Sequence, residues 1–165
     1  MHMRKKVLLK FLFLKLTVVV LAQVPMMDFD QLEPRLRTGS DSVYIVNFWA
    51  TWCVPCVKEL PGFERINEEY TDRKVKVLLV SLDNPNHMES RIIPFVEKHE
   101  LKSEIILLDD PRSHHWIPRV DESWSGAIPA TIVFTRNSRS FYEKVFTWEE
   151  LEDIVISKLN RVSLN

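Results

Sequence analysis

The stretch from Ser42 to Pro61, SVYIVNFWATWCVPCVKELP, constrains the fold more than any other part of this sequence. Its first half is an almost continuous run of β-branched and aromatic residues, which predicts a strand buried on both faces of a mostly parallel sheet. Its second half has apolar residues three or four positions apart, which is typical of a helix: Val57, Leu60, Phe63, Ile66 and Tyr70. A strand that leads directly into a helix predicts an α/β fold.

Cys53 and Cys56 are the 2 cysteines of the chain, and their spacing places both on the first turn of this helix. A helix N-terminus presents unpaired N–H groups and the positive end of the macrodipole, and both favour an anion. We therefore expect Cys53 to be the nucleophilic thiolate and Cys56 to be the resolving thiol. Lowering a thiol pKa from about 8.5 to about 7 corresponds to roughly 2 kcal/mol in favour of the ionised form. Pro55 stiffens the turn between the two sulfurs, because its fixed φ suits the opening of a helix.

The segment NFWATWCVPC, from Asn47 to Cys56, resembles the thioredoxin superfamily, especially its extracytoplasmic TlpA-like and ResA-like thiol-disulfide oxidoreductases. A bare C-x-x-C would be a weaker signal, because zinc sites share it, and Val57 excludes the C-x-x-C-H pattern of haem attachment. The resemblance covers about residues 24–160. It implies a thioredoxin-like three-layer fold, with a central mixed sheet, helices on both faces and an extra helix-strand insert at residues 87–108.

Pro129 is the second landmark, within WSGAIPATIVF, residues 124–134. In thioredoxin-like proteins the equivalent X-Pro bond is cis and faces the active-site cysteines, so the resemblance implies a cis Ile128–Pro129 bond. A plain proline at the start of a strand is the alternative, since only about 5–6% of X-Pro bonds in folded proteins are cis. The residues expected to bind substrate are Trp52, Pro55, Ile128 and Pro129.

Glu59 matches by position an active-site glutamate of the ResA-like group, where this residue tunes cysteine acidity and shuttles protons. The alternative is an ordinary carboxylate on the helix surface. Asn47 occupies the place where thioredoxin itself has a buried acid. An amide cannot take up and release a proton in that role, so we expect proton transfer through Glu59, water or the partner protein.

Three tryptophans near these landmarks have different predicted surroundings. Trp52 is expected to be exposed beside the sulfur, because an amphipathic ring suits a contact surface. Trp49 is expected in the core. Trp124 either lines the substrate groove or packs under its loop.

Residues 1–22 resemble a secretory signal, because Arg4, Lys5 and Lys6 precede a mostly apolar stretch that ends in Val20-Leu21-Ala22. The clean apolar run, residues 16–22, is too short for the ~20 residues of a spanning helix. The prediction is a thioredoxin-like domain at residues 23–165 in the periplasm or another extracytoplasmic space. The alternative is a cytoplasmic protein in which residues 17–21 form the first strand.

The remaining elements follow from local patterns. Helices are predicted at residues 28–37, on one side of the sheet, and at 88–101, with a kink or restart at Pro94. Asp110 is expected to cap a short helix that has Pro111 at its first position. A hairpin is expected from strands 130–135 and 140–146 around a turn at 136–139. Strands at 75–82 and 105–108 and a final helix after the capping box at 147–150 complete the prediction.

Dithiol-disulfide exchange is the predicted reaction, with protein disulfides or thiols as substrates and a membrane thiol-transfer protein as the electron donor implied by the resemblance. The exchange requires no metal or organic cofactor. Zinc is not expected, because the adjacent His114 and His115 would point apart on a helix and no further cysteine remains. A net charge of −1 and a pI near 6.5 argue against a nucleic-acid surface. We expect a monomer. The alternatives are a thiol peroxidase of the peroxiredoxin-like type and a non-enzymatic peptide-binding or chaperone module.

Overall fold

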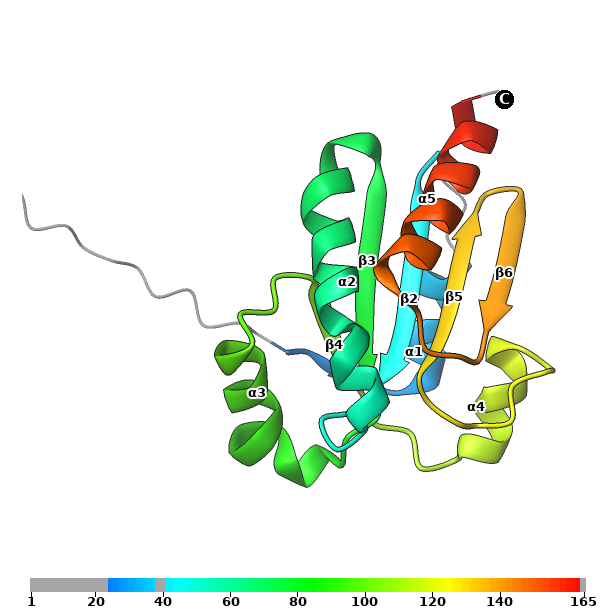
Figure 1. Cartoon of the computed structure of the whole chain (residues 1–165). Coiled ribbons are helices and arrows are strands. Elements are labelled where there is room, and N and C mark those ends of the chain that lie inside the picture. The colour runs from blue at the N-terminus through cyan, green and yellow to red at the C-terminus, as the bar shows by residue number, and fades with distance from the viewer. Residues whose placement is uncertain (1–23, 38–40, 164–165) are drawn as a thin grey trace, which may run out of the picture.

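The computed structural model describes residues 24–37 and 41–163, so the predicted signal at 1–22 and the alternative strand at 17–21 lie outside the described residues. Within these ranges a mixed sheet has the strand order β1-β4-β3-β2-β5-β6 (Figure 1). Its strands are β1 (Met26–Met27), β2 (Val43–Trp49), β3 (Val75–Ser81), β4 (Glu104–Leu108), β5 (Ala130–Thr135) and β6 (Ser138–Tyr142). β1 to β4 are parallel, whereas β5 pairs antiparallel with β2 and β6 antiparallel with β5. The predicted α/β class with a mixed central sheet is confirmed.

Helices cover both faces of the sheet, so the predicted three layers are present (Figure 1). We call the face covered by α2 (Val54–Tyr70), α3 (Ile93–Lys98) and α5 (Trp148–Ser163) the site face. The opposite face is covered by α1 (Phe29–Leu32), η1 (Glu33–Leu36) and α4 (Ser113–Val120). Residues 24–37 and 41–163 contain no helix with the length and apolar character needed to cross a membrane.

Strand β2 lies in the middle of the sheet, between β3 and β5. Alternate side chains of a strand point to opposite faces, so Ile45 and Trp49 pack on the site face while Val46 and Phe48 pack on the opposite face. All four are at most 2% exposed. The nearly continuous apolar run of the sequence is therefore explained by burial on both sides.

The predicted insert consists of a helical segment followed by strand β4. The helix restarts near Pro94 as expected, because the π-helix η4 (Met88–Ile92) gives way to α3 at Ile93. The 3-10 helix η3 (Pro85–His87) precedes it. Strand β4 then inserts between β3 and the two-residue strand β1, which the sequence did not predict.

The helix predicted at residues 28–37 is shorter than expected. Asp28 and Gln31 form a capping box at the start of α1, and the segment continues from Glu33 as the 3-10 helix η1. Pro34 lies in this second part, where its missing N–H is incompatible with a regular α-helical ladder. The expected apolar side chains, Phe29, Leu32 and Leu36, are nevertheless buried against the sheet.

The predicted start of the helix after β4 is wrong. Helix α4 begins at Ser113, and its N-cap position is Arg112 rather than Asp110. The Asp110 carboxylate instead accepts hydrogen bonds from the Arg112 backbone N–H (3.0 Å) and from its guanidinium (2.9 and 3.0 Å). Arg112 therefore binds the Asp110 carboxylate that the sequence predicted to cap the helix.

The hairpin turn is also tighter than predicted. Thr135 pairs with Ser138, so only Arg136 and Asn137 connect the strands, and β6 ends at Tyr142 rather than at Phe146. The capping box after it is as expected. The Glu150 N–H donates to Thr147 Oγ1 (3.3 Å) and the Thr147 N–H donates to a Glu150 carboxylate oxygen (3.1 Å).

Candidate functional site

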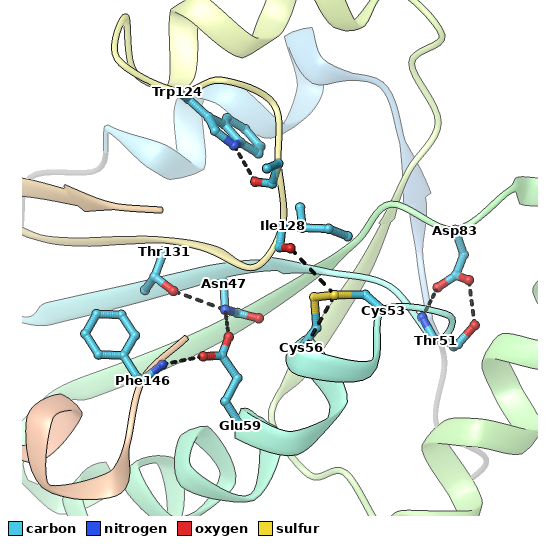
Figure 2. The surroundings of a disulfide bond; sticks show 11 residues. Asn47, Thr51, Cys53, Cys56, Glu59, Asp83, Trp124, Ile128, Thr131 and Phe146 are labelled. Carbon is cyan, nitrogen blue, oxygen red and sulfur yellow. Dashed lines mark hydrogen bonds between the residues drawn. A yellow bond between two sulfur atoms is a disulfide. The ribbon is translucent and has the colours of Figure 1, made fainter. Parts of the chain in front are cut away.

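Cys53 and Cys56 form a disulfide at the start of α2, with an S–S distance of 1.98 Å (Figure 2). Cys53 is the N-cap residue of this 17-residue helix. The Cys56 N–H points at the Cys53 sulfur, at an N–S distance of 3.3 Å. Cys53 is 5% exposed and Cys56 is 0% exposed. After reduction, the same N–H and the helix macrodipole would stabilise a thiolate on Cys53.

The Ile128–Pro129 peptide bond is cis, as the resemblance implied. The Ile128 carbonyl oxygen lies 3.7 Å from the Cys53 sulfur (Figure 2). In the disulfide this sulfur carries no hydrogen, so the approach is a contact, whereas the reduced thiol could donate to the same oxygen. The loop before β5 therefore borders the more exposed of the two sulfurs.

Trp124 supports this loop from the opposite face of the sheet and does not line a groove. Its side chain is 5% exposed and packs against Phe48, with ring centroids 4.9 Å apart. Its indole N–H donates to the Ala127 carbonyl at 2.7 Å. Gly126 has a φ of +94°, and a Cβ at this position would lie 3.3 Å from Ile117, so a side chain is disfavoured. The turn that delivers Ile128 to the disulfide is thus built on the opposite face.

Glu59 is buried beside the disulfide, at 5% exposure, so the alternative of an ordinary surface carboxylate is wrong. Its carboxylate accepts hydrogen bonds from the Asn47 side-chain amide (2.9 Å) and from the Phe146 backbone N–H (2.8 Å) (Figure 2). Burial raises its pKa to about 7, although both hydrogen bonds act to lower it. A carboxyl group that titrates near neutral pH therefore lies one helical turn from Cys56.

Asn47 links this carboxyl group to strand β5. Its amide NH2 donates to both Glu59 and the Thr131 hydroxyl, the latter at 3.1 Å. All three side chains are at most 5% exposed. The polar cluster has no cationic member, so neutral hydrogen bonds from Asn47 and the Phe146 N–H, rather than an ion pair, oppose the desolvation of the Glu59 carboxylate.

The rim of the site is apolar. Trp52 is 59% exposed and Val54 is 64% exposed, and Pro55 beside them is exposed as well. Trp49, by contrast, is 0% exposed, as predicted for a core residue. The exposed apolar side chains next to the buried disulfide form a surface on which an extended chain could lie.

Asp83 belongs to the site although the sequence indicated only a turn there. Its carboxylate accepts from the Thr51 backbone N–H (2.9 Å) and from the Thr51 hydroxyl (2.6 Å), two residues before Cys53 (Figure 2). Asp83 is 2% exposed. The available signal was an acid directly after a predicted buried strand, at the sheet edge where parallel strands end and loops carry function.

No cluster suited to a metal ion occurs in the part of the chain that the structure describes. A groove of about 460 Å³ lies on the flank of α2, between Glu64, Arg65 and residues 99–102. Neither cysteine lines it.

The sequence matches the AhpC/TSA family over residues 20–139. It is 35% identical over 72 residues to the thioredoxin-like protein YneN of Bacillus subtilis, a match that covers 44% of this chain and 42% of that protein. It is 32% identical over 74 residues to the thiol-disulfide oxidoreductase ResA of Oceanobacillus iheyensis, covering 45% of this chain and 37% of that protein. The matches thus span less than half the length of these relatives.

Solved structures show the same fold. The thioredoxin-related protein of Neisseria meningitidis serogroup B superposes with a TM-score of 0.63 and 23% identity, over 76% of this chain and 90% of that one. A thiol:disulfide interchange protein of Chlorobium tepidum superposes with a TM-score of 0.62 and 19% identity, over 77% and 84%. The sheet and helices described above are therefore thioredoxin-like.

Proposed function

The chain belongs to the AhpC/TSA family, and from that premise we propose that it is a thiol-disulfide oxidoreductase that reduces protein disulfides outside the cytoplasm. The observation that carries the proposal is the Cys53–Cys56 disulfide at the N-terminus of α2, in contact with the loop of a cis proline. Relatives named thiol-disulfide oxidoreductase support it.

The reaction begins from the reduced pair. The Cys53 thiolate attacks one sulfur of a substrate disulfide, which forms a mixed disulfide and releases the other substrate sulfur as a thiolate. Cys56 loses its proton and attacks the Cys53 sulfur, and the second substrate sulfur departs. The substrate gains two electrons, and the enzyme is left with the Cys53–Cys56 disulfide of this structure. No cofactor takes part.

Glu59 serves as the proton acceptor in the second step. Cys56 is 0% exposed, so bulk water has poor access to its proton. A carboxyl group with a pKa of about 7, one turn along the same helix, is ionised in a substantial fraction of molecules at neutral pH. It can therefore accept this proton directly or through water.

The substrate lies across Trp52 and Pro55 and pairs with the backbone at Ile128 and Pro129. Trp52 supplies exposed apolar area, and the Ile128 carbonyl faces Cys53 at 3.7 Å. An extended polypeptide can bond to such backbone groups without a defined side-chain sequence. The choice of client then depends on whether the client exposes a disulfide and on its contact with the apolar rim of the site.

Residues 1–22 act as an export signal, and a membrane thiol-transfer protein returns electrons to the oxidised pair. The basic start and apolar stretch of this segment support export. Fractionation tests this part separately, because an uncleaved cytoplasmic chain would contradict it. The chemistry at Cys53 would be unaffected by that result.

The decisive experiment replaces Cys56 with Ser in cells and identifies the proteins held on Cys53 as mixed disulfides. Disulfide-linked clients that disappear in the Cys53→Ser/Cys56→Ser control support the proposal, and alkylation reports whether the wild-type pair is mostly reduced, as a reductase requires. A mostly oxidised pair would indicate that the protein oxidises its clients instead of reducing them. Hydrogen peroxide turnover comparable to disulfide turnover would favour a peroxidase, and full biological activity of Cys53→Ala would favour a chaperone.

A further inference from the structure

We propose that Asp83 is a positioning residue for Cys53, which it orients through Thr51 without touching the sulfur. The proposal rests on the exchange reaction proposed above and adds a residue to its machinery. Asp83 lies directly after the end of β3, whereas the cysteines lie after β2. The two segments are neighbours because β2 and β3 pair in parallel, so their C-terminal ends meet at one edge of the sheet.

Both oxygens of the Asp83 carboxylate accept hydrogen bonds at this edge of the sheet. One oxygen accepts from the Thr51 hydroxyl (2.6 Å), and the other accepts from the Thr51 N–H (2.9 Å) and the Ser81 hydroxyl (2.9 Å). The Ser81 hydroxyl also accepts from the Asp83 backbone N–H at 3.1 Å, which fixes the carboxylate in turn. Asp83 is 2% exposed, so the loss of these hydrogen bonds would leave buried polar groups unpaired.

Thr51 occupies the turn that delivers the nucleophile. The Cys53 N–H donates to the Ala50 carbonyl at 3.1 Å, which closes a four-residue turn from Ala50 to Cys53. Within it, Trp52 is 59% exposed, so solvent and not packing surrounds much of its side chain. The Asp83 carboxylate binds Thr51 through both its backbone N–H and its side-chain hydroxyl (Figure 2).

A second bond completes the attachment of this turn to β3. The Leu82 N–H donates to the Trp49 carbonyl at 2.8 Å, at the last residue of β2. The turn is therefore held at its start by backbone pairing and at Thr51 by Asp83. Cys53 follows as the N-cap of α2, and its sulfur must stay beside the Cys56 N–H for the thiolate to be stabilised.

Attack on a disulfide requires the three sulfur atoms to align, so a nucleophile that shifts loses rate even when it remains ionised. Small misplacements of a reacting group cost up to about 10²-fold in rate. Loosening Thr51 lets the turn and the Cys53 sulfur move together. Asp83 thus contributes to catalysis by restricting this motion.

The test measures two rates on the purified reduced protein: reduction of a peptide disulfide, and alkylation of Cys53 by iodoacetamide across pH. Asp83→Ala is expected to slow disulfide reduction about tenfold per folded molecule. Thr51→Val, which leaves every charge in place, is expected to slow it less and to raise the apparent pKa of Cys53. Thr51→Ser keeps the hydroxyl and is expected to restore both values to those of the wild type.

Asp110→Ala is the matched control. Asp110 is also a buried aspartate, 9% exposed, just beyond the end of the neighbouring strand β4, but its carboxylate binds Arg112. It is expected to lower stability and to leave the rate per folded molecule and the Cys53 pKa unchanged. The double variant Asp83→Ala/Thr51→Val is expected to be no slower than Asp83→Ala alone, because contacting residues that act as one unit are not additive.

Equal rates and an equal Cys53 pKa in wild type, Asp83→Ala and Thr51→Val would overturn the proposal, as would a loss that Thr51→Ser fails to restore. If Asp83→Ala does not fold, the Thr51 variants decide alone. A wild type that alkylates at Cys53 but reduces no disulfide would instead refute the proposed function. The alkylation profile would still test the contact between Asp83 and Thr51, because it needs no disulfide substrate.

Discussion

The two faces of the sheet bury different kinds of side chain. The site face carries the disulfide and the polar cluster of Asn47, Glu59 and Thr131 beneath α2. The opposite face carries an aromatic cluster in which Trp116 lies between Phe29 and Trp124, with ring centroids 5.7 Å from each. The site face can change its covalent bonding and its charge. The aromatic side chains of the opposite face neither exchange disulfides nor ionise near neutral pH.

The difference shows how the two faces divide the work. The aromatic face supports the loop of Pro129 from the far side of the sheet, because Trp124 packs on Phe48 and bonds to the Ala127 carbonyl. The reactive groups approach this loop from the site face. We therefore expect substitutions on the site face to change rates and pH dependence, and substitutions of aromatic-face residues other than Trp124, which bonds to the loop of Pro129, to change stability alone.

The largest effect that sharpens this contrast is expected from Cys53→Ser. The variant loses the nucleophile, so the rate of insulin disulfide reduction should fall at least about 10³-fold. The midpoint of urea unfolding, compared with that of the reduced wild type, should change little. Reduction at more than a tenth of the wild-type rate would contradict both the mechanism and the assignment of reactivity to this face.

On the aromatic face, Trp116→Ala should lower the free energy of unfolding by about 3–5 kcal/mol. The ring is 4% exposed, and its N–H also donates to the Asp110 carbonyl at 3.0 Å. Urea titration measures the loss, and the rate of disulfide reduction per folded molecule should stay that of the wild type. Trp52→Ala is the matched control: at 59% exposure it should leave stability within about 0.5 kcal/mol and raise KM.

Glu59→Gln should remove a pH dependence of stability that belongs to the site face alone. The pKa of Glu59 is raised from 4.5 to about 7 in the folded protein, so between these values the native state binds more protons than the unfolded state. The free energy of unfolding of the oxidised protein therefore falls as pH rises from 4.5 to 7, by up to about 3 kcal/mol, and then levels off.

Urea titrations of the oxidised protein at pH 4 to 8 measure this slope. The exposed Glu68, on the same helix, provides the control, because Glu68→Gln should leave the slope in place. A slope that persists in Glu59→Gln would assign the titration to another group and remove one distinction between the two faces.

The smallest predicted effect concerns the start of α5, at the border of the polar cluster. Thr147→Ala removes the capping hydroxyl that bonds to the Glu150 N–H and should cost about 1 kcal/mol, with an unchanged denaturant slope. Thr147→Ser should restore most of this stability. A large change in the Glu59 pKa in Thr147→Ala would show that the cap also positions Phe146, whose N–H bonds to Glu59.

The sequence predicts best what depends on neighbours along the chain. β2 and α2 follow from apolar periodicity, and the capping box at Thr147 uses groups three residues apart. The cis bond at Pro129 was accessible only through the resemblance, because the proline alone does not specify it.

The features that the sequence did not predict depend mostly on contacts between distant segments. Asp83 is polar and follows a strand, so its sequence surroundings indicate a turn; its role depends on Thr51, 32 positions away. Glu59 is buried and bonds to Asn47 and to the Phe146 N–H, which are 12 and 87 positions away in the sequence. Asp110 failed as a cap for a local reason, since Arg112 offers its carboxylate a stronger, charged partner than a helix N–H.

The complete burial of Cys56 has a consequence for chemical labelling. After reduction, we expect a bulky maleimide to react with Cys53 before Cys56, because Cys53 is 5% exposed and Cys56 is 0% exposed. A fluorophore or affinity tag could then be attached to the protein first at Cys53, with no cysteine removed by mutation among the 2 that the chain contains.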